Sequence, residues 1–514
     1  MSDSEPASLA ELRRRVARAR QGGSAAAHET FAAAGKRFAR DRVAALLDPG
    51  SFVENGLLAR TMDEGLAADG VVCGMGTIGG RPVCVVANDF TVKAGTWGRQ
   101  TIRKIYRQQE EAERSRCPIV YLVDSAGARL DEQFDLFVDR QHAGRIFLTQ
   151  CRMSGRIPQI CVLLGSSPAG AAYMPAFCDA VIMVDGHASA YLGSPRMVQM
   201  ATREEVTSED MGGARMHCEV SGLGDHLAAD EDAALVAVRR YLEYLPQHWE
   251  TPVPPAEPRA PWPGPPLSTV VPEAQNTAFD MRKVLDGLFD EGSVFQHRQL
   301  FAPELITAFA RLEGRAVGVL ANQPMRKGGV LTGDSSDKGA QFVSLCNAYG
   351  LPLLFLCDVP GFMVGTAVER AGIIRHGAKF LQALADCSVP RICVVLRKAY
   401  GAGYLAMSGA SFGADATIAL PQAKLAIMGP EAAVNAIHYR RIAAIADEEE
   451  RAAYVAARRE EYMADLDVFR AASEAYLDAV VSADDLRAEL ALRLRHYTGR
   501  ELGAPRRRTS VVRG

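Results

Sequence analysis

The chain has 514 residues, enough for more than one domain with a buried core. Its apolar share of 48% and charged share of 23% are ordinary for a globular protein, and a net charge of −3 gives no chain-wide reason to expect nucleic-acid binding. No apolar run approaches the length that crosses a bilayer, and residues 1–11 lack the apolar centre of a signal peptide, so the sequence predicts a cytoplasmic protein.

Short apolar runs alternate with longer amphipathic stretches along the chain. The runs at 118–124 (PIVYLVD) and 158–165 (PQICVLLG) are bounded by Pro and Gly and predict buried strands. Strand–helix alternation favours a parallel α/β arrangement. The expected helices lie at 9–20, 99–116, 140–154, 447–459 and 471–494.

Residues 251–266, TPVPPAEPRAPWPGPP, interrupt this alternation. So many prolines exclude both helix and central strand and predict a semi-rigid, extended connector. The expected division is therefore an N-terminal domain at 1–250, a Pro-rich linker at 251–268 and a C-terminal domain at 269–514.

The two halves of the sequence repeat each other. Residues 80–83 (GRPV) match 314–317 (GRAV), the strand at 118–124 matches 352–358, and 157–162 (IPQICV) matches 389–394 (VPRICV). The separation stays at 232 to 234 residues, which indicates two copies of one α/β domain.

Each copy follows one strand with a small-residue segment, GSSPAGAAY at 165–173 and RKAYGAGY at 397–404. We match Ala169-Gly170 with Ala402-Gly403. Small side chains let a carbonyl oxygen approach the backbone, and a following helix would direct free N–H groups at it, which are the requirements of an oxyanion hole. A second pair of loops, at 124–129 and 358–365, follows the strands that end in Asp124 and Asp358 and is placed where ligand crevices form.

Other chemistries find less support. The motif Gly-x-Ser-x-Gly at 409–413 has no expected strand before it, and His376 and His438 are interpreted as polar surface or loop residues. The eleven cysteines form no Cys-x-x-Cys pair and are expected to be reduced core residues, with no metal in this chain. A basic cluster at 506–508 is expected to be a solvated terminus.

Several long motifs in order make a family resemblance specific. The segments VANDFTVKAG, DSAGAR, GSSPAGAAYMPAFCD, DVPGF, RKAYG and MGPE resemble the β (carboxyltransferase) subunits of acetyl-, propionyl- and methylcrotonyl-CoA carboxylases. The resemblance implies α/β architecture with tandem duplicated crotonase-like (ClpP/crotonase) domains. It also implies transfer of CO2 from carboxybiotin to an acyl-CoA enolate, with the thioester at Ala169-Gly170 and the biotin ureido oxygen at Ala402-Gly403.

The resemblance further assigns the acyl-CoA thioester mainly to the N-terminal domain and biotin mainly to the C-terminal domain. Sites between chains of a homo-hexamer are implied. The acyl-CoA-binding residues expected from it are Ala126, Gly127, Ala128, Tyr173 and Leu405. The expected biotin-binding residues are Pro360, Gly361, Phe362 and Tyr404.

The chain carries no Met-Lys-Met biotinylation signal, so biotin is expected on a partner, a biotinylated α subunit. The insertion at 131–147 resembles the methylcrotonyl type, whereas residues 358–380 resemble the propionyl and acetyl type. The apolar Leu405 argues against simple transfer of acetyl or propionyl specificity. The acyl group stays open. Two alternatives also stay open: the carboxyltransferase component of an acyl-CoA decarboxylase, and a non-catalytic scaffold subunit. A crotonase-type hydratase or isomerase is disfavoured because neither copy shows a catalytic carboxylate pair.

Overall fold

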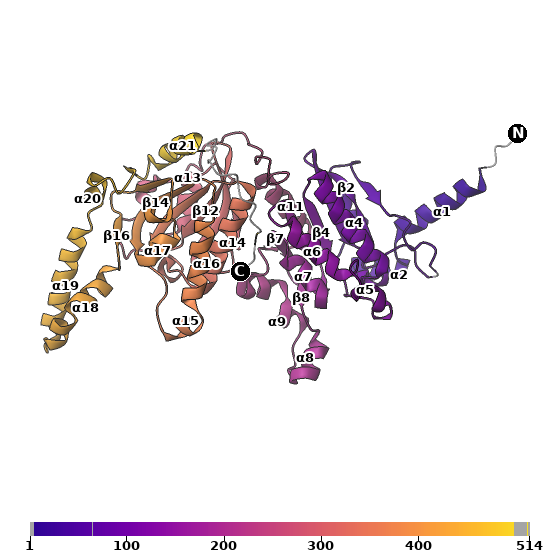
Figure 1. Cartoon of the computed structure of the whole chain (residues 1–514), viewed down its shortest axis with the longest axis horizontal. Helices are drawn as coiled ribbons and strands as arrows, with labels where there is room; N and C mark the ends of the chain where they lie inside the picture. Colours follow the sequence, from indigo (N-terminus) through magenta and orange to yellow (C-terminus); the bar gives the residue numbers. More distant parts are fainter. Residues whose placement is uncertain (1–4, 64, 498–510, 512–514) are drawn as a thin grey trace. The chain divides into compact units, whose positions relative to one another are not determined.

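The computed structural model describes residues 5–63, 65–497 and 511 (Figure 1). They form two compact units, unit 1 up to Val253 with Val511, and unit 2 from Pro254 onward. The basic cluster at 506–508 lies outside the described residues.

Unit 1 is built on one twisted, mostly parallel sheet with strand order β1-β2-β3-β4-β5-β7-β9, in which only β1, β2 and β3 pair antiparallel. Its strands are β1 Val53–Asn55, β2 Val71–Ile78, β3 Arg81–Asn88, β4 Ile119–Val123, β5 Gln159–Leu163, β6 Ser166–Pro168, β7 Ala180–Val184, β8 Ser189–Tyr191 and β9 His226–Ala228. Its helices are α1 Ala7–Gln21, α2 Ala25–Ala33, α3 Ala39–Leu46, α4 Arg99–Ser115, α5 Phe134–Phe137, α6 Ala143–Met153, α7 Tyr173–Ala176, α8 Pro195–Thr202, α9 Ser208–Gly212, α10 Ala214–Met216 and α11 Glu231–Tyr244.

Both faces of this sheet are covered, which is why its strands read as continuous apolar runs. Alternate side chains such as Tyr121 and Cys161 join α4 and α6 in one core cluster. Their neighbours Val120 and Ile160 are equally buried on the opposite face, where α3 and α11 contact the sheet.

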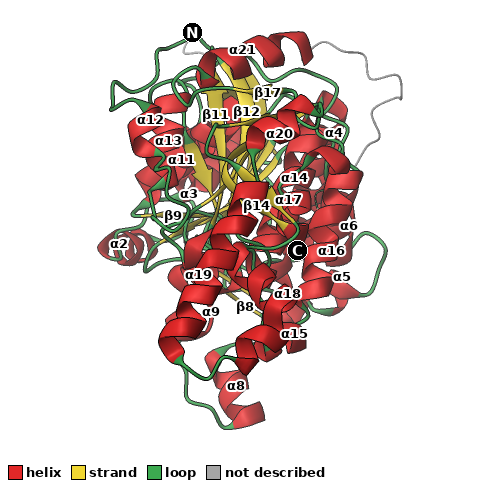
Figure 2. Cartoon of the chain, turned by 90° about the vertical axis from the view of Figure 1, so that its left-hand side faces the viewer, coloured by secondary structure: helices red, strands yellow, loops and turns green. Residues whose placement is uncertain are grey.

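Unit 2 repeats this topology with the order β10-β11-β12-β13-β14-β15-β17, and β16 pairs with the end of β14. Its strands (yellow in Figure 2) are β10 Phe295–His297, β11 Leu305–Leu312, β12 Arg315–Asn322, β13 Leu353–Val359, β14 Arg391–Tyr400, β15 Ala416–Ala419, β16 Lys424–Ala426 and β17 Ala479–Val480. Its helices are α12 Leu267–Val270, α13 Met281–Leu288, α14 Gly333–Tyr349, α15 Thr366–Arg370, α16 Ile373–Ala385, α17 Gly401–Ala406, α18 Pro430–Ala444, α19 Glu448–Asp465, α20 Val468–Ser473 and α21 Leu486–Tyr497. The duplicated fold expected from the sequence is confirmed.

The Pro-rich segment has no helix or strand between 253 and 260. Backbone hydrogen bonds tie it to unit 2, from Ala256 N–H to the Gly314 carbonyl (3.0 Å) and from Glu291 N–H to the Ala260 carbonyl (2.9 Å). A Cβ on Gly314, whose φ is +76°, would meet the Ala256 oxygen at 2.0 Å, so this crossing requires glycine.

One predicted helix is wrong. Residues 471–494 do not form a single helix, because α20 ends at Ser473 and Ala475 adopts a left-handed φ of 57°. The chain then pairs β17 in parallel with β15, Ala479 opposite Ile418, before α21 begins. Sheet pairing, a tertiary interaction, therefore overrides the helical pattern of this stretch. The other four helix predictions are confirmed, with ends that shift by up to six residues.

Candidate functional site

The first predicted turn follows β6, which pairs in parallel with β8. A 3-10 turn at Ala169–Ala172 begins there and leads into α7. Ala169 and Gly170 are both exposed, and they open the 3-10 turn, so their N–H groups have no partner within the turn itself. This is expected for the first residues of a helical turn.

The second predicted turn begins later in the chain than the sequence indicated. Residues 397–400 are not a loop, because β14 continues to Tyr400 and pairs there with β16. Helix α17 then begins directly at Gly401, so the N–H groups of Ala402 and Gly403 lie in its first turn. Ala402 is exposed and Gly403 is buried.

The register between the two turns also needs a correction of one residue. Ala169 and Gly401 both have a φ of 55° and lie 232 residues apart, the same separation as Ile157 and Val389. Ala169 thus corresponds to Gly401, and Gly170 to Ala402. The helices that follow are short, at four residues for α7 and six for α17, so the donors are individual N–H groups rather than a long helix dipole.

The loops after β4 and β13 pack against these turns in the same way. Gly127 has a φ of 100°, accepts a hydrogen bond from Trp97 N–H (2.8 Å), and lies against Pro168. Its counterpart Gly361, with a φ of 129°, accepts from Leu331 N–H (3.0 Å). Each unit therefore holds its turn and its loop together at the carboxyl edge of the sheet.

In unit 1 the turn and the loop open into one cavity of about 590 Å³. Of the predicted residues it brings together Gly127, Ala128, Ala169 and Gly170. Ala126 is exposed beside it, while Tyr173 does not line the cavity and instead stacks on Phe177 at 6.2 Å.

A cavity beside the second turn, in unit 2, is more polar and has a volume of about 690 Å³. It is lined by Pro360 and Tyr400 together with charged side chains, Lys398, Lys424, Glu431 and Arg459 among them. Burial, and then the carboxylates of Glu431 and Asp358, raise the pKa of Tyr400 to about 12, so its hydroxyl stays a donor at neutral pH.

The other residues predicted for unit 2 lie outside this cavity. Gly361, Phe362 and Tyr404 do not line it, and Leu405 lines neither cavity. A Cβ on Gly403 would lie 2.9 Å from both Gly361 Cα and Val359 Cγ2, so the second turn and the Pro360–Phe362 loop are in direct backbone contact. The structure thus groups Pro360, Gly361 and Gly403 but leaves Leu405 half-buried on α17.

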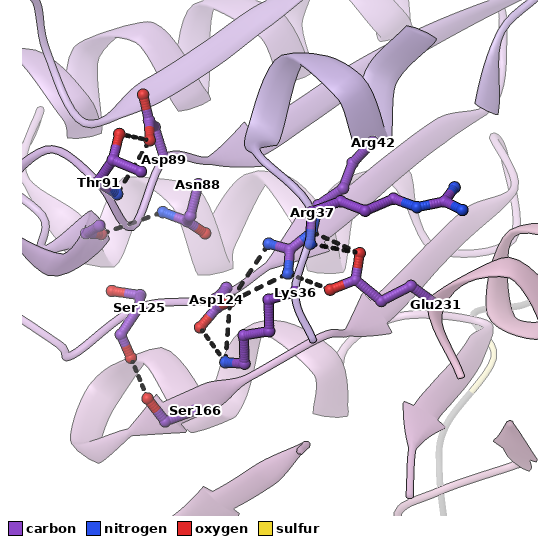
Figure 3. A network of polar contacts seen from close by, with 11 residues as sticks. Lys36, Arg37, Arg42, Asn88, Asp89, Thr91, Asp124, Ser125, Ser166 and Glu231 are labelled. Atoms are coloured by element: carbon purple, nitrogen blue, oxygen red, sulfur yellow. Dashed lines mark hydrogen bonds and ion pairs between the residues drawn. The ribbon is translucent and has the colours of Figure 1, made fainter. Parts of the chain in front are cut away.

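A buried ionic network fixes the loop of unit 1 (Figure 3). Asp124, at the end of β4, is fully buried and pairs with Lys36 (3.1 Å) and Arg42 (3.2 Å), and Arg42 also binds Glu231. Ser166 Oγ donates to the Ser125 carbonyl (2.8 Å), which joins β6 to the start of the loop. Two cations balance two carboxylates, as buried charges require.

In unit 2 the equivalent buried carboxylate is paired with a cation from a different position in the repeat. Asp358 pairs with Arg397 at 2.7 Å, and both side chains are fully buried. Arg397 corresponds to Gly165 at the 232-residue spacing. A Cβ on Gly165 would lie 1.8 Å from Asp124 Oδ1 and 2.7 Å from Lys36 Nζ, so glycine there leaves room for the lysine from outside the repeat.

Sequence reasoning missed the aromatic walls of the unit 1 cavity, Trp97, Phe134, Phe137 and Phe147. The run of apolar residues in the otherwise polar segment 131–147 was the available signal.

The two histidines considered in the sequence analysis lie on helices, with His376 bound to Asp337 (2.7 Å) and His438 to Tyr454 (3.3 Å). No strand leads into Ser411, as expected.

All eleven cysteines are free, and Cys151 is the exposed one. Across residues 5–63, 65–497 and 511, no group of three or more His, Cys, Asp or Glu side chains is arranged to hold a metal ion. No helix in that part of the chain is both long and apolar enough to span a membrane.

Comparison with known proteins agrees with this architecture. Residues 31–511 match the carboxyl transferase domain family. The chain is 52% identical to the uncharacterized carboxylase YngE of Bacillus subtilis over 98% of both proteins. It is 40% identical to the propionyl-CoA carboxylase beta chain of Saccharopolyspora erythraea, covering 97% of this chain and 94% of that one. The hexameric transcarboxylase 12S structure with methylmalonyl-coenzyme A bound superposes with a TM-score of 0.91 at 36% identity, over 99% of each chain.

The duplicated crotonase-like fold, together with these relatives, identifies the chain as an enzyme that acts on acyl-CoA thioesters. Within that class, the chain belongs to the carboxyl transferase family of biotin-dependent acyl-CoA enzymes.

Proposed function

We propose that this protein is the carboxyltransferase subunit of an acyl-CoA carboxylase, in which the two matched turns hold two carbonyl oxygens by backbone N–H groups. The observation that supports the proposal is the pair of turns, in which Ala169-Gly170 and Ala402-Gly403 supply the first N–H groups of a short helical turn at the same edge of two duplicated sheets. Biotin, when bound, supplies the carboxyl group and a base for the acyl-CoA proton.

In unit 1 the N–H groups of Ala169 and Gly170 would bind the thioester oxygen of the acyl-CoA. Negative charge develops on that oxygen when the acyl carbon loses its proton, so these donors stabilise the transition state more than the ground state. Among the described residues, no ionisable side chain lines this cavity. The described lining therefore offers no general base beside the acyl carbon, which agrees with a base that arrives with biotin.

In unit 2 the N–H groups of Ala402 and Gly403 would bind the ureido oxygen of biotin. An acceptor oxygen can reach this turn because Ala402 is exposed, and the contact of Gly403 with Gly361 fixes the backbone there. Pro360 and Phe362, exposed and half-exposed beside that contact, would flank the ring.

The experiment mixes the purified protein with free biotin and malonyl-, methylmalonyl- or methylglutaconyl-CoA and follows decarboxylation. We expect turnover of at least one thioester, and a loss of roughly 100-fold or more in Gly170→Val, because a side chain at this turn blocks access to the donors. A Cβ at Gly170 meets nothing within 4 Å, so the variant should fold normally. Normal rates in a folded Gly170→Val protein would refute the assignment of the first turn.

The partner and the assembly are part of the proposal. We expect a biotinylated α subunit to co-purify from the host, detected with streptavidin, and a homo-hexamer like that named for transcarboxylase 12S. A membrane-bound decarboxylase subunit in place of the α subunit would instead indicate the decarboxylase alternative. Absence of any half-reaction from an intact oligomer would indicate the scaffold alternative.

A further inference from the structure

The cavity beside the first turn is large and apolar. We propose that it receives an apolar acyl chain of more than three carbons, so that the preferred substrate is a CoA thioester of a medium-chain or branched acid rather than acetyl- or propionyl-CoA. This inference rests on the proposed function, in which the thioester oxygen lies at Ala169-Gly170.

The walls of the cavity favour hydrocarbon. Trp97, Ile102, Phe134, Phe137 and Phe147 line it, and Gln133 contributes the one amide side chain. Trp97 and Phe147 pack with ring centroids 6.4 Å apart, and Phe147 lies 6.0 Å from Phe177, so the aromatic wall is held by its neighbours. An occupant with polar or charged atoms would find few partners there.

The size of the cavity points in the same direction. A volume of about 590 Å³ equals the liquid volume of about twenty water molecules, far more than a two- or three-carbon acyl group fills. The start of α6 contributes only Ala143 and Gly144 to the lining, and a Cβ on Gly144 would meet nothing within 4 Å. Small residues therefore keep this side of the cavity open.

The remaining wall is a short segment with a fixed base and an exposed apolar tip. Glu132 anchors it by bonds to Arg60 (2.5 Å), Arg129 (3.2 Å) and the Arg99 N–H (2.9 Å). Phe134 and Phe137 line the cavity yet are 78% and 82% exposed. A bound acyl chain would cover this apolar surface, which gives the chain-length preference its driving force.

The test measures the affinity of the full-length protein for CoA and for acetyl-, butyryl-, octanoyl- and 3-methylcrotonyl-CoA by calorimetry. Each buried methylene is expected to tighten binding about fourfold until the cavity is filled. Gly144→Leu should weaken the binding of octanoyl-CoA at least ten times more than that of acetyl-CoA, because leucine fills the open side without a clash. Arg152→Leu, on the exposed face of the same helix and outside the cavity, is the matched control.

Phe137→Ala provides a second variant, since so exposed a side chain contributes little to folding; octanoyl-CoA should again bind more weakly. Equal affinities for acetyl- and octanoyl-CoA, or unchanged octanoyl-CoA binding in both variants, would overturn the inference. Decarboxylation of malonyl-CoA with free biotin would in that case still support the proposed function. Failure to bind any CoA thioester, with no decarboxylation, would contradict the proposed function itself.

Discussion

At the scale of single residues, two glycines five positions apart have opposite roles. Gly165 is buried, and a side chain there would overlap the Asp124 carboxylate and displace Lys36, whereas Gly170 faces open space. One is required by packing and the other borders the cavity. The sequence alone does not distinguish these two roles.

We expect Gly165→Ala to destabilise the protein by about 3–5 kcal/mol, the usual cost of breaking a buried ion pair. Gly170→Ala should change the free energy of unfolding by less than about 1 kcal/mol. Urea unfolding of both variants beside the wild type checks this. Similar losses in the two proteins would mean that the Asp124–Lys36 pair does not constrain this position.

Lys338 in α14 makes the stability of the protein depend on pH. Its side chain is fully buried, its Nζ donates to the Phe301 carbonyl (2.8 Å), and burial followed by the charge of Arg298 lowers its pKa from 10.5 to about 7. Between these values the unfolded chain binds more protons than the folded one, so this lysine makes stability rise with pH in that window.

The variant Lys338→Met should lack this contribution. Wild-type stability should therefore increase relative to the variant as the pH is raised from about 7 toward 10, measured by urea unfolding at each pH. A constant difference between the two proteins would show that Lys338 keeps an ordinary pKa in the folded state.

At the scale of elements, the segment around α5 depends on one carboxylate. Burial alone would raise the pKa of Glu132, but the hydrogen bonds from the Arg99 N–H, Arg60 and Arg129 outweigh it and lower the pKa overall. The carboxylate form is thus favoured in the folded protein, and its stabilising effect is present above the ordinary glutamate pKa and lost as the pH falls through the lowered one.

Glu132→Gln should loosen residues 130–138 while the sheet keeps its stability, because the amide replaces a charge that binds two arginines. Hydrogen exchange followed by mass spectrometry should show faster exchange in this segment at neutral pH. The exposed pair Arg114–Glu111 on α4 offers a control, since Glu111→Gln should leave the segment unchanged. Unchanged exchange in Glu132→Gln would mean that Glu132 does not hold the segment.

The strands also show which elements the sequence patterns can predict. The buried strands β4 and β5 were predictable because both faces are covered and the apolar runs are continuous. The strand β17 was not, since two residues of pairing with β15 leave no periodic signal. For the same reason β14 was expected to end before Tyr400, although pairing with β16 extends it.

At the scale of the whole molecule, the proposed hexamer predicts a solution mass near six times the 55.4 kDa of the chain, measured by light scattering after size-exclusion chromatography. The mass should not depend on the variants Gly170→Val or Gly144→Leu, whose positions meet no neighbouring atom within 4 Å. A monomer at micromolar concentration would contradict the proposed assembly.

The sequence by itself determined the duplication, the α/β class and the family, because these depend on long patterns that repeat at a constant spacing and on motifs in a fixed order. It also located both turns to within one residue. The tertiary structure decided the rest. Only folding brings segment 131–147 against the first turn to form an apolar cavity, and only folding shows Lys36 and Arg397 neutralising equivalent carboxylates from different places in the chain. Such contacts join residues that are far apart in the sequence, so local sequence patterns cannot predict them.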